Sequence, residues 1–229
     1  MQKIFLEDEP DLEIFLRRNS KARRLTLRIS ALDGKITVTG PNHIDFKELK
    51  NFAESKKSWL KSKQKSFKSP VLVSEGIKIP IGGRDTKISF GEFQKPKKVG
   101  SILFVCKQKP VSTQVKKYLK EICRIRLDFI CRGFAERLGS IVRKITLRDT
   151  RSRWGSCSND ANLMFSWRLI MAPENILAYV AAHEVAHLKH MDHSKDFWET
   201  VEYLFGPYKN ERAWLKQNGS SLHRYKFES

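Results

Sequence analysis

Cysteine is scarce in this sequence. Only four of the 229 residues are cysteines, and no two of them form a Cys-x-x-Cys pair. This spacing offers no disulfide framework, so a reducing compartment is the simpler interpretation. No apolar run approaches the about 20 residues that a helix needs to cross a bilayer. The first 18 positions are rich in acidic residues, which argues against a signal or transit peptide. We therefore expect a cytoplasmic protein without a membrane partner.

Acidic residues are also few overall. The chain has 25 Asp and Glu against 44 Lys and Arg, which gives a formal net charge of +19. Such an excess favours acidic partners, among them nucleic acid and nucleotides, but says nothing about fold. One stretch without any acid contains Arg17, Arg18, Lys21, Arg23, Arg24 and Arg28. Together with a lysine-rich segment after it, this stretch could form one basic N-terminal face for phosphates. Separate solvated patches are the alternative.

Alternation of polar and apolar residues predicts strands in the first third of the chain. The two clearest runs are residues 24–29 and 35–39, with the turn dipeptide Asp33-Gly34 between them. Residues 45–67 have apolar positions at helical spacing and a lysine-rich opposite face, which predicts one basic helix. Strand-like patches return between Gly76 and Val105. The expected N-terminal region, residues 1–110, is therefore small, β-rich and basic.

The remainder, residues 111–229, is expected to form a second domain. A long helical pattern begins there, and Gly139 stands where a helix C-cap belongs. Two strand-like runs follow, residues 141–147 and 163–170. Pro173 then opens a helix that is expected to reach about Met191. The whole chain is thus predicted to have an α+β fold, with a boundary near residue 110.

The helix after Pro173 carries the motif His183-Glu184-Val185-Ala186-His187. At about 3.6 residues per turn, His183 and His187 project from the same face, one turn apart, and can reach one metal ion. Glu184 points about a quarter turn away, so it can act on a metal-bound water without being a ligand. An apolar stretch before the motif predicts that this face is buried. Two surface histidines on a helix are the plain alternative.

A catalytic zinc needs a third protein ligand and an open position. His190 lies on the same helical face, but about 10 Å of helix rise separates it from His183. His193 lies just past the expected helix end, where a chain reversal can return it to the metal, so we prefer it. A carboxylate from Glu199 or Glu202 is the alternative. Zinc is the expected ion, although histidine ligands suit other divalent metals.

The segment that links the two strand-like runs contains Arg151 and Arg153 beside Trp154-Gly155. One arginine could stabilise negative charge in a transition state. An equal alternative is a structural pair, stacked on Trp154 or tied to a carboxylate. Gly155 is expected at a position that needs unusual backbone angles. The strand at residues 163–169 could be an edge that pairs with an extended peptide, or a plain core strand.

Five parts of the sequence together form a recognisable pattern: Arg151–Cys157, Phe165–Leu169, His183–Leu188, His190 and His193–Trp198. In these runs the sequence resembles the YgjP-like family of metal-dependent hydrolases, which is usually classed among metallopeptidases. The likeness is strong from about Thr113 to Asn218, is looser over residues 17–105, and finds no counterpart for the tail after Gly219.

The resemblance implies a zincin-like C-terminal domain of helices and strands, related to SprT-like and Wss1-like zinc proteases. It also implies that His183, His187 and His193 bind zinc and that Glu184 is catalytic. It does not settle the substrate, because likeness of fold is a weak guide to what is cleaved.

The sequence is therefore compatible with three alternative functions. The first is a zinc metallopeptidase, in which Glu184 activates a zinc-bound water for attack on a peptide carbonyl. The second keeps the metal centre but hydrolyses a phosphoanhydride bond of a nucleoside triphosphate, which the positive charge favours. The third is a DNA-associated binding protein with a non-catalytic metal, although such a metal would not need Glu184. The substrate, peptide or nucleotide, and the oligomeric state remain open.

Overall fold

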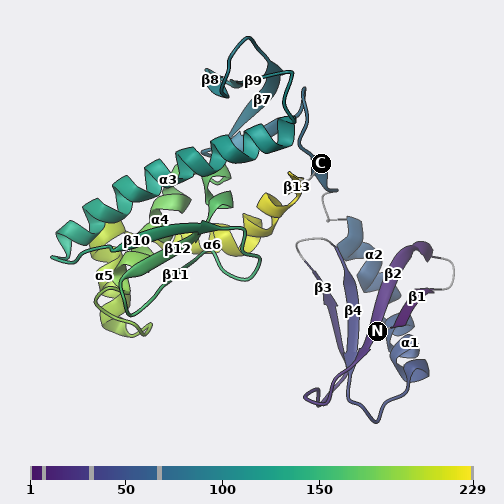
Figure 1. The fold of residues 1–229 in the computed structure, drawn as a ribbon. Coiled ribbons are helices and arrows are strands. Elements are labelled where there is room, and N and C mark those ends of the chain that lie inside the picture. The colour runs from purple at the N-terminus through teal and green to yellow at the C-terminus, as the bar shows by residue number, and fades with distance from the viewer. Residues whose placement is uncertain (1, 7–8, 31–33, 66–68, 228–229) are drawn as a thin grey trace. The chain divides into compact units, whose positions relative to one another are not determined.

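The computed structural model describes residues 2–6, 9–30, 34–65 and 69–227. The chain forms two compact units, Met1–Pro70 and Val71–Ser229, each with its own hydrophobic core (Figure 1). The boundary therefore lies at residue 70 and not near residue 110. The reason is that the strands before residue 110 bury Ile79, Ile88 and Leu103 in the core of the second unit. The α+β class is confirmed, with several small sheets and helices in one chain.

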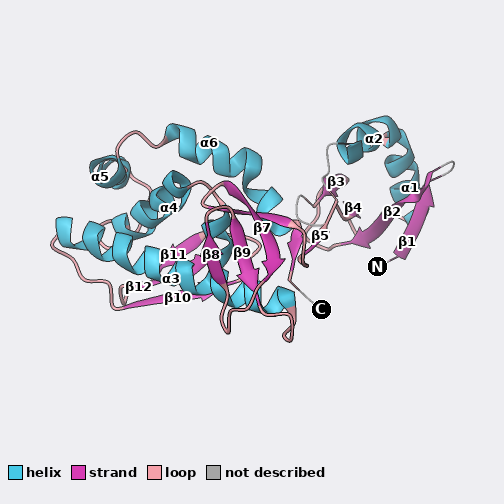
Figure 2. Ribbon diagram, turned by 90° about the horizontal axis from the view of Figure 1, so that it is seen from above, coloured by secondary structure: helices cyan, strands magenta, loops and turns pink. Residues whose placement is uncertain are grey.

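The first unit is a four-stranded sheet with two helices on one face (Figure 2). Its strands are β1 (Gln2–Leu6), β2 (Glu9–Arg18), β3 (Thr26–Ile29) and β4 (Ile36–Gly40), in the order β1-β2-β4-β3. β2 and β4 are parallel, and the other two pairs are antiparallel. The helices are α1 (Phe46–Ser55) and α2 (Lys57–Lys65). Leu49 and Leu60 of these helices join Ile14 and Val38 of the sheet in one buried cluster.

Two predictions for the first unit have different outcomes. The strands expected at residues 24–29 and 35–39 are confirmed as the antiparallel pair β3 and β4, although Asp33 of the expected turn lies outside the described residues. The single basic helix expected over residues 45–67 is wrong, because the helix breaks at Lys56, where φ is −107° and ψ is 9°. The hydroxyl of Ser55 hydrogen-bonds to the carbonyl of Phe52 at 2.8 Å just before this break. Such a local bond competes with regular helical pairing.

Two small sheets contact a long helix in the second unit. The first sheet consists of β6 (Lys78–Ile81), β7 (Arg84–Phe90), β8 (Lys97–Val99) and β9 (Ile102–Val105), in the order β6-β7-β9-β8. The helix is α3 (Val111–Arg137), and Gly139 follows it at a φ of +60°, as expected for a helix C-cap. The second sheet consists of β10 (Lys144–Arg148), β11 (Gly155–Cys157) and β12 (Asn162–Ser166), in the order β10-β12-β11.

Three further helices complete this unit: α4 (Glu174–Ala186), α5 (Lys195–Phe205) and α6 (Lys209–Asn218). α4 is buried between α3, α5, α6 and β11. The expected run of this helix to Met191 is wrong, because it ends at Ala186 with His187 as its C-cap. Tight hydrogen bonds follow, from Leu188 N–H to the Val185 carbonyl and from Lys189 N–H to the Ala186 carbonyl. They close the last turn and let the chain reverse.

The segment after Gly219 is an integral part of the second unit. A short 3-10 helix, Gly219–His223, leads to β13 (Tyr225–Lys226), which pairs in parallel with β5 (Val71–Leu72). Leu222 and Phe227 are buried in the common core. No helix among the described residues is both long and apolar enough to cross a membrane.

Candidate metal centre

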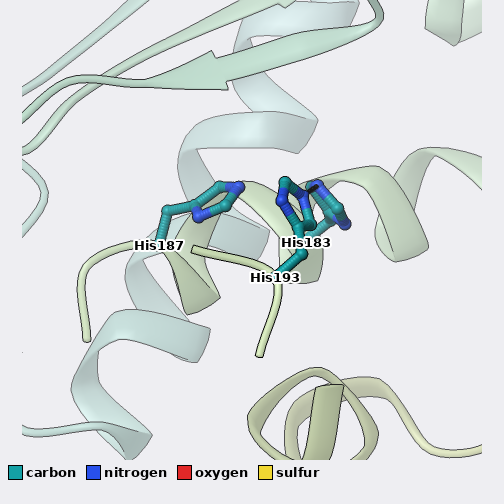
Figure 3. Close-up of side chains that lie close together, drawn as sticks. All are labelled: His183, His187 and His193. Atoms are coloured by element: carbon teal, nitrogen blue, oxygen red, sulfur yellow. Dashed lines mark hydrogen bonds between the residues drawn. The ribbon is translucent and has the colours of Figure 1, made fainter. Parts of the chain in front are cut away.

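Three histidines from the C-terminal helical region lie close together. His183 is on α4, His187 is its C-cap, and His193 precedes α5. One ring nitrogen from each histidine lies within 4.8 Å of those of the other two (Figure 3). The Nε2 atoms of His183 and His193 are 3.2 Å apart. Two nitrogens bound to the same tetrahedral zinc at about 2.0–2.1 Å are separated by about 3.3 Å. The donor set therefore fits a zinc-type ion without rearrangement of this pair.

The early end of α4 is what brings His193 back to the other two histidines. The chain reverses between Ala186 and Ser194, and Ser194 then caps α5 by accepting a hydrogen bond from the N–H of Phe197 at 3.5 Å. Ser194 N–H in turn donates to Asp192 Oδ1 at 3.2 Å. These local bonds fix the segment that carries His193.

His190 contacts the histidine cluster through its backbone carbonyl and not through its ring. Its carbonyl oxygen lies 2.9 Å from His187 Nδ1. Because a carbonyl can only accept, Nδ1 carries the proton, which leaves the Nε2 lone pair of His187 for a metal. The described cluster contains neither the ring of His190 nor the carboxylates of Glu199 and Glu202.

Burial favours the neutral form of the His183 and His187 rings. It lowers the pKa of His183 to about 3, with further contributions from His187 and His193, and it lowers the pKa of His187 as well. Neutral imidazole is the form that binds metals. His193 is exposed, so the cluster is open to solvent on its side. A solvent-facing position is what a catalytic ion needs for a substrate or water.

Glu184 is only 5% exposed and lies on α4 next to His183. Burial raises the pKa of Glu184 to about 8, an effect that the charge of Arg153 partly opposes. A buried carboxyl group with a raised pKa is typical of functional acid–base groups.

Gly155, at the start of β11, lies directly against Glu184. A Cβ atom added at Gly155 would lie 2.5 Å from both Cγ and Oε1 of Glu184. The expectation of unusual backbone angles at Gly155 is wrong, since its φ is not positive. What this position requires is the absence of a side chain, so that β11 and α4 can approach each other.

The two candidate arginines face different neighbours. Arg153 is exposed, and its charge acts on Glu184. The charge of Arg151 acts instead on His223, in the C-terminal segment. Trp154, between them, packs against the His223 ring at a centroid distance of 5.5 Å, and no described arginine stacks on it. Arg153 is therefore the arginine that lies near the candidate centre.

An aromatic ring beneath the cluster was not singled out from the sequence as part of the site. Phe197 is fully buried, and its ring centroid lies 4.9, 4.5 and 4.7 Å from those of His183, His187 and His193. Its position on the apolar face of the helix capped by Ser194 was visible in the sequence. The contact with all three histidines follows only from the chain reversal.

An ion pair between buried Arg168 and the exposed carboxylate of Asp149 fixes the segment before Gly155. Arg168 donates to Asp149 at 2.6 and 3.1 Å, and to the carbonyls of Leu222 and Tyr225 at 3.0 Å each. Burial opposes ionisation of Asp149, but the bonds and charge of Arg168 hold the pKa of that carboxyl below its usual value. This cluster connects the loop that precedes β11 to the C-terminal segment.

Comparison with known proteins identifies the family of this chain. The family described as YgjP-like, metallopeptidase domain matches residues 23–218. No curated protein matches the sequence. Among solved structures, the crystal structure of the metallopeptidase zymogen of Pyrococcus abyssi abylysin is similar at 20% identity and a TM-score of 0.37, over 43% of this chain and 97% of that one. Because the family match spans most of the chain and includes all three histidines, this protein belongs to the YgjP-like metallopeptidase domain family.

Proposed function

We propose that this chain is a zinc metallopeptidase in which His183, His187 and His193 hold the ion and Glu184 is the general base. The observation that carries the proposal is the cluster of three histidines within 4.8 Å beside one buried carboxyl group. A zinc ion bound there would polarise the scissile carbonyl and acidify the attacking water. The zincin-like arrangement of helices and strands belongs to the same proposal.

In this proposal Glu184 carries out both proton transfers of the hydrolysis. Glu184 takes a proton from the attacking water and then delivers it to the leaving amine. Its raised pKa suits both steps near neutral pH. Arg153, whose charge acts on Glu184, is exposed and could contact the negative charge that develops on the carbonyl oxygen.

The second sheet supports a peptide as the substrate. The strand expected at residues 163–169 is β12, which ends at Ser166, where the 3-10 helix Trp167–Met171 begins. β12 pairs with β10 on one side and β11 on the other, so of its two expected roles, edge and core strand, the edge is wrong. The edge next to α4 is β11, and among the described strands only β12 pairs with it. An extended peptide can add to such an edge through main-chain hydrogen bonds. It would then run past Gly155 and Glu184.

The test compares wild type, Glu184→Gln and a control, Glu202→Gln, which alters an exposed carboxylate of α5. Each zinc-loaded protein is incubated with a denatured protein and, separately, with nucleoside triphosphates. We expect Glu184→Gln to lose peptide cleavage by about 100-fold to 10,000-fold while it keeps its zinc, and the control to resemble wild type. Glu184-dependent release of phosphate without peptide cleavage would contradict the proposal. Absence of both activities in the wild type would also contradict it.

A further inference from the structure

The sheet of the first unit has one face that its helices do not cover. Alternate residues of β2 and β4 are buried against α1 and α2, so the residues between them point to the opposite, open face. The lysine-rich helices therefore do not combine with the arginine-rich stretch into one basic face. The strand register places the open-face residues in two cross-strand rows, Arg17, Thr39 and Thr26 in one, and Phe15, Thr37 and Arg28 in the next.

A hollow of about 930 Å³ lies on this open face. Thr26, Thr37 and Thr39 line it, and none of the residues that the structure describes in its lining is acidic. We call it the basic hollow because six cationic side chains line it: Arg17, Lys21, Arg23, Arg24, Arg28 and Lys35. The segment between β2 and β3 supplies half of these residues.

The arginines of the basic hollow lack the partners that arginines have elsewhere in the chain. In the second unit, Arg126, Arg132 and Arg168 each pair with a carboxylate. Over the part of the chain that the structure describes, no ion pair involves the exposed side chains of the hollow's four arginines, Arg17, Arg23, Arg24 and Arg28. Like charges gathered without acids create a local field that attracts anions.

The chemistry of the lining favours nucleic acid over a lipid surface. Guanidinium groups and hydroxyls are donors to phosphate oxygens. The described lining has no large apolar side chain to insert into a bilayer. The described lining also has no aromatic ring on which a base could stack. Phe5 and Phe15 belong to the same face of the sheet but lie outside the lining, and a lysine ammonium lies over each of their rings.

From these observations we propose that the basic hollow binds duplex nucleic acid through its phosphate backbone, without reading the bases. The lack of stacking rings is the reason for choosing a duplex over a single strand. This binding would be independent of the metal centre, because all the residues that line the hollow belong to the first unit.

The full chain is tested with a labelled DNA duplex of mixed sequence, and the dissociation constant is measured over a range of salt concentrations. We expect the affinity of the wild type to fall steeply as salt rises. The triple variant Arg17→Gln, Arg24→Gln, Arg28→Gln should bind at least about tenfold more weakly at low salt. Its slope of log affinity against log salt should be smaller by about 2 to 3, which corresponds to three lost phosphate contacts.

The matched control removes three exposed arginines of the second unit: Arg84→Gln, Arg143→Gln and Arg148→Gln. It has the same loss of net charge and should bind the duplex as the wild type does. Equal weakening in both triple variants would overturn the proposal, because net charge alone would then explain binding. Tighter binding of the single strand than of the duplex would also overturn it. A third result would overturn it too: the triple variant of the first unit binds the duplex as the wild type does but no longer binds phosphatidylglycerol vesicles.

Discussion

Gly155 and Glu184 approach each other so closely that the identity of one limits the position of the other. The space at Gly155 is filled by the Glu184 side chain itself, whose Cγ and Oε1 would both be 2.5 Å from an added Cβ. A flexible carboxylate can move away from such an atom, but only by leaving its present position against β11. A residue outside the histidine motif thus determines the geometry of the proposed base.

Replacement of Gly155 by alanine should therefore reduce peptide hydrolysis with little change in zinc content. A displacement of about 1 Å can cost on the order of 100-fold in rate. The control is Gly133→Ala, where an added Cβ meets nothing within 4 Å and the residue lies in α3. This control should keep full activity and unfold at an equal or slightly higher temperature. Wild-type activity in Gly155→Ala would show that Glu184 need not stay in this position.

The choice between His193 and His190 as the third ligand can be measured directly. His193→Ala removes a ring nitrogen 3.2 Å from His183 Nε2 and should reduce bound zinc to well below one per chain. His190→Ala keeps the backbone carbonyl that accepts from His187 Nδ1 and should retain zinc. Measurement of the zinc content of the two purified variants decides between the two histidines. Loss of zinc from His190→Ala alone would make the assignment wrong.

At the scale of secondary-structure elements, the candidate centre depends on how the ends of elements are fixed. α4 ends at Ala186, the Ser194 cap starts α5, and the ion pair of Arg168 with Asp149 fixes the segment before β11. Arg168 also donates hydrogen bonds to the carbonyls of Leu222 and Tyr225 in the C-terminal segment. The stability of the second unit therefore depends on this one buried side chain.

Replacement of Arg168 by methionine should lower the free energy of unfolding by about 2–3 kcal/mol, because it removes hydrogen bonds that involve a charged group and leaves polar partners unsatisfied. The control, Arg132→Met, breaks an exposed pair with Asp128 one helical turn away and should lower the stability much less, because solvent screens such a pair. Urea titration of both variants measures the difference. Equal stabilities would show that the Arg168 cluster is not what holds the C-terminal segment.

The same cluster predicts a pH dependence of stability. Burial, with the nearby charge of Arg168, lowers the pKa of His223 to about 4. Between pH 6.5 and 4 the unfolded chain binds a proton that the folded chain does not, so stability falls as pH falls through this range. The loss from this group should reach about 2–3 kcal/mol at pH 4 and should be absent above pH 6.5.

His223→Gln should flatten this part of the stability profile, and the exposed His43→Gln of the first unit should leave it unchanged. Tryptophan fluorescence during urea unfolding is a suitable measurement, because Trp154, Trp167, Trp198 and Trp214 lie in the second unit and only Trp59 lies in the first. An unchanged slope between pH 6.5 and 4 in His223→Gln would contradict the argument.

At the scale of the whole molecule, the chain consists of two units with separate cores and separate proposed roles. The two buried clusters share no residue. The candidate metal centre lies entirely in the second unit, and the basic hollow lies entirely in the first. Each unit can therefore be altered without direct damage to the core of the other.

The fragment 71–229 should accordingly fold by itself, unfold cooperatively and bind one zinc ion. It should also lose the duplex binding that we attribute to the basic hollow. Circular dichroism, metal analysis and the same duplex titration would measure these three properties. A fragment that aggregates or binds no zinc would show that the second unit needs the first one to fold.

The sequence by itself indicated the His183–His187 motif, the presence of a helix that carries it and the α+β class, because these depend on local spacing, and it indicated the family through runs of residues that resemble it. His193 was chosen because a chain reversal was expected after the helix, and it does lie in the described cluster, while its role as a metal ligand stays a prediction. The pairing of β3 with β4 was also readable, since a turn signal joins two alternating runs.

Only the tertiary structure decided the features that depend on contacts between distant segments. The unit boundary lies at residue 70 because strands before residue 110 find their apolar partners in α3 and beyond. Gly155 is needed for space next to Glu184, and Arg168 binds carbonyls more than 50 residues away in the chain. The open face of the first sheet exists because the helices cover the other one. No pattern in the sequence predicts such contacts, since packing, and not local preference, selects them.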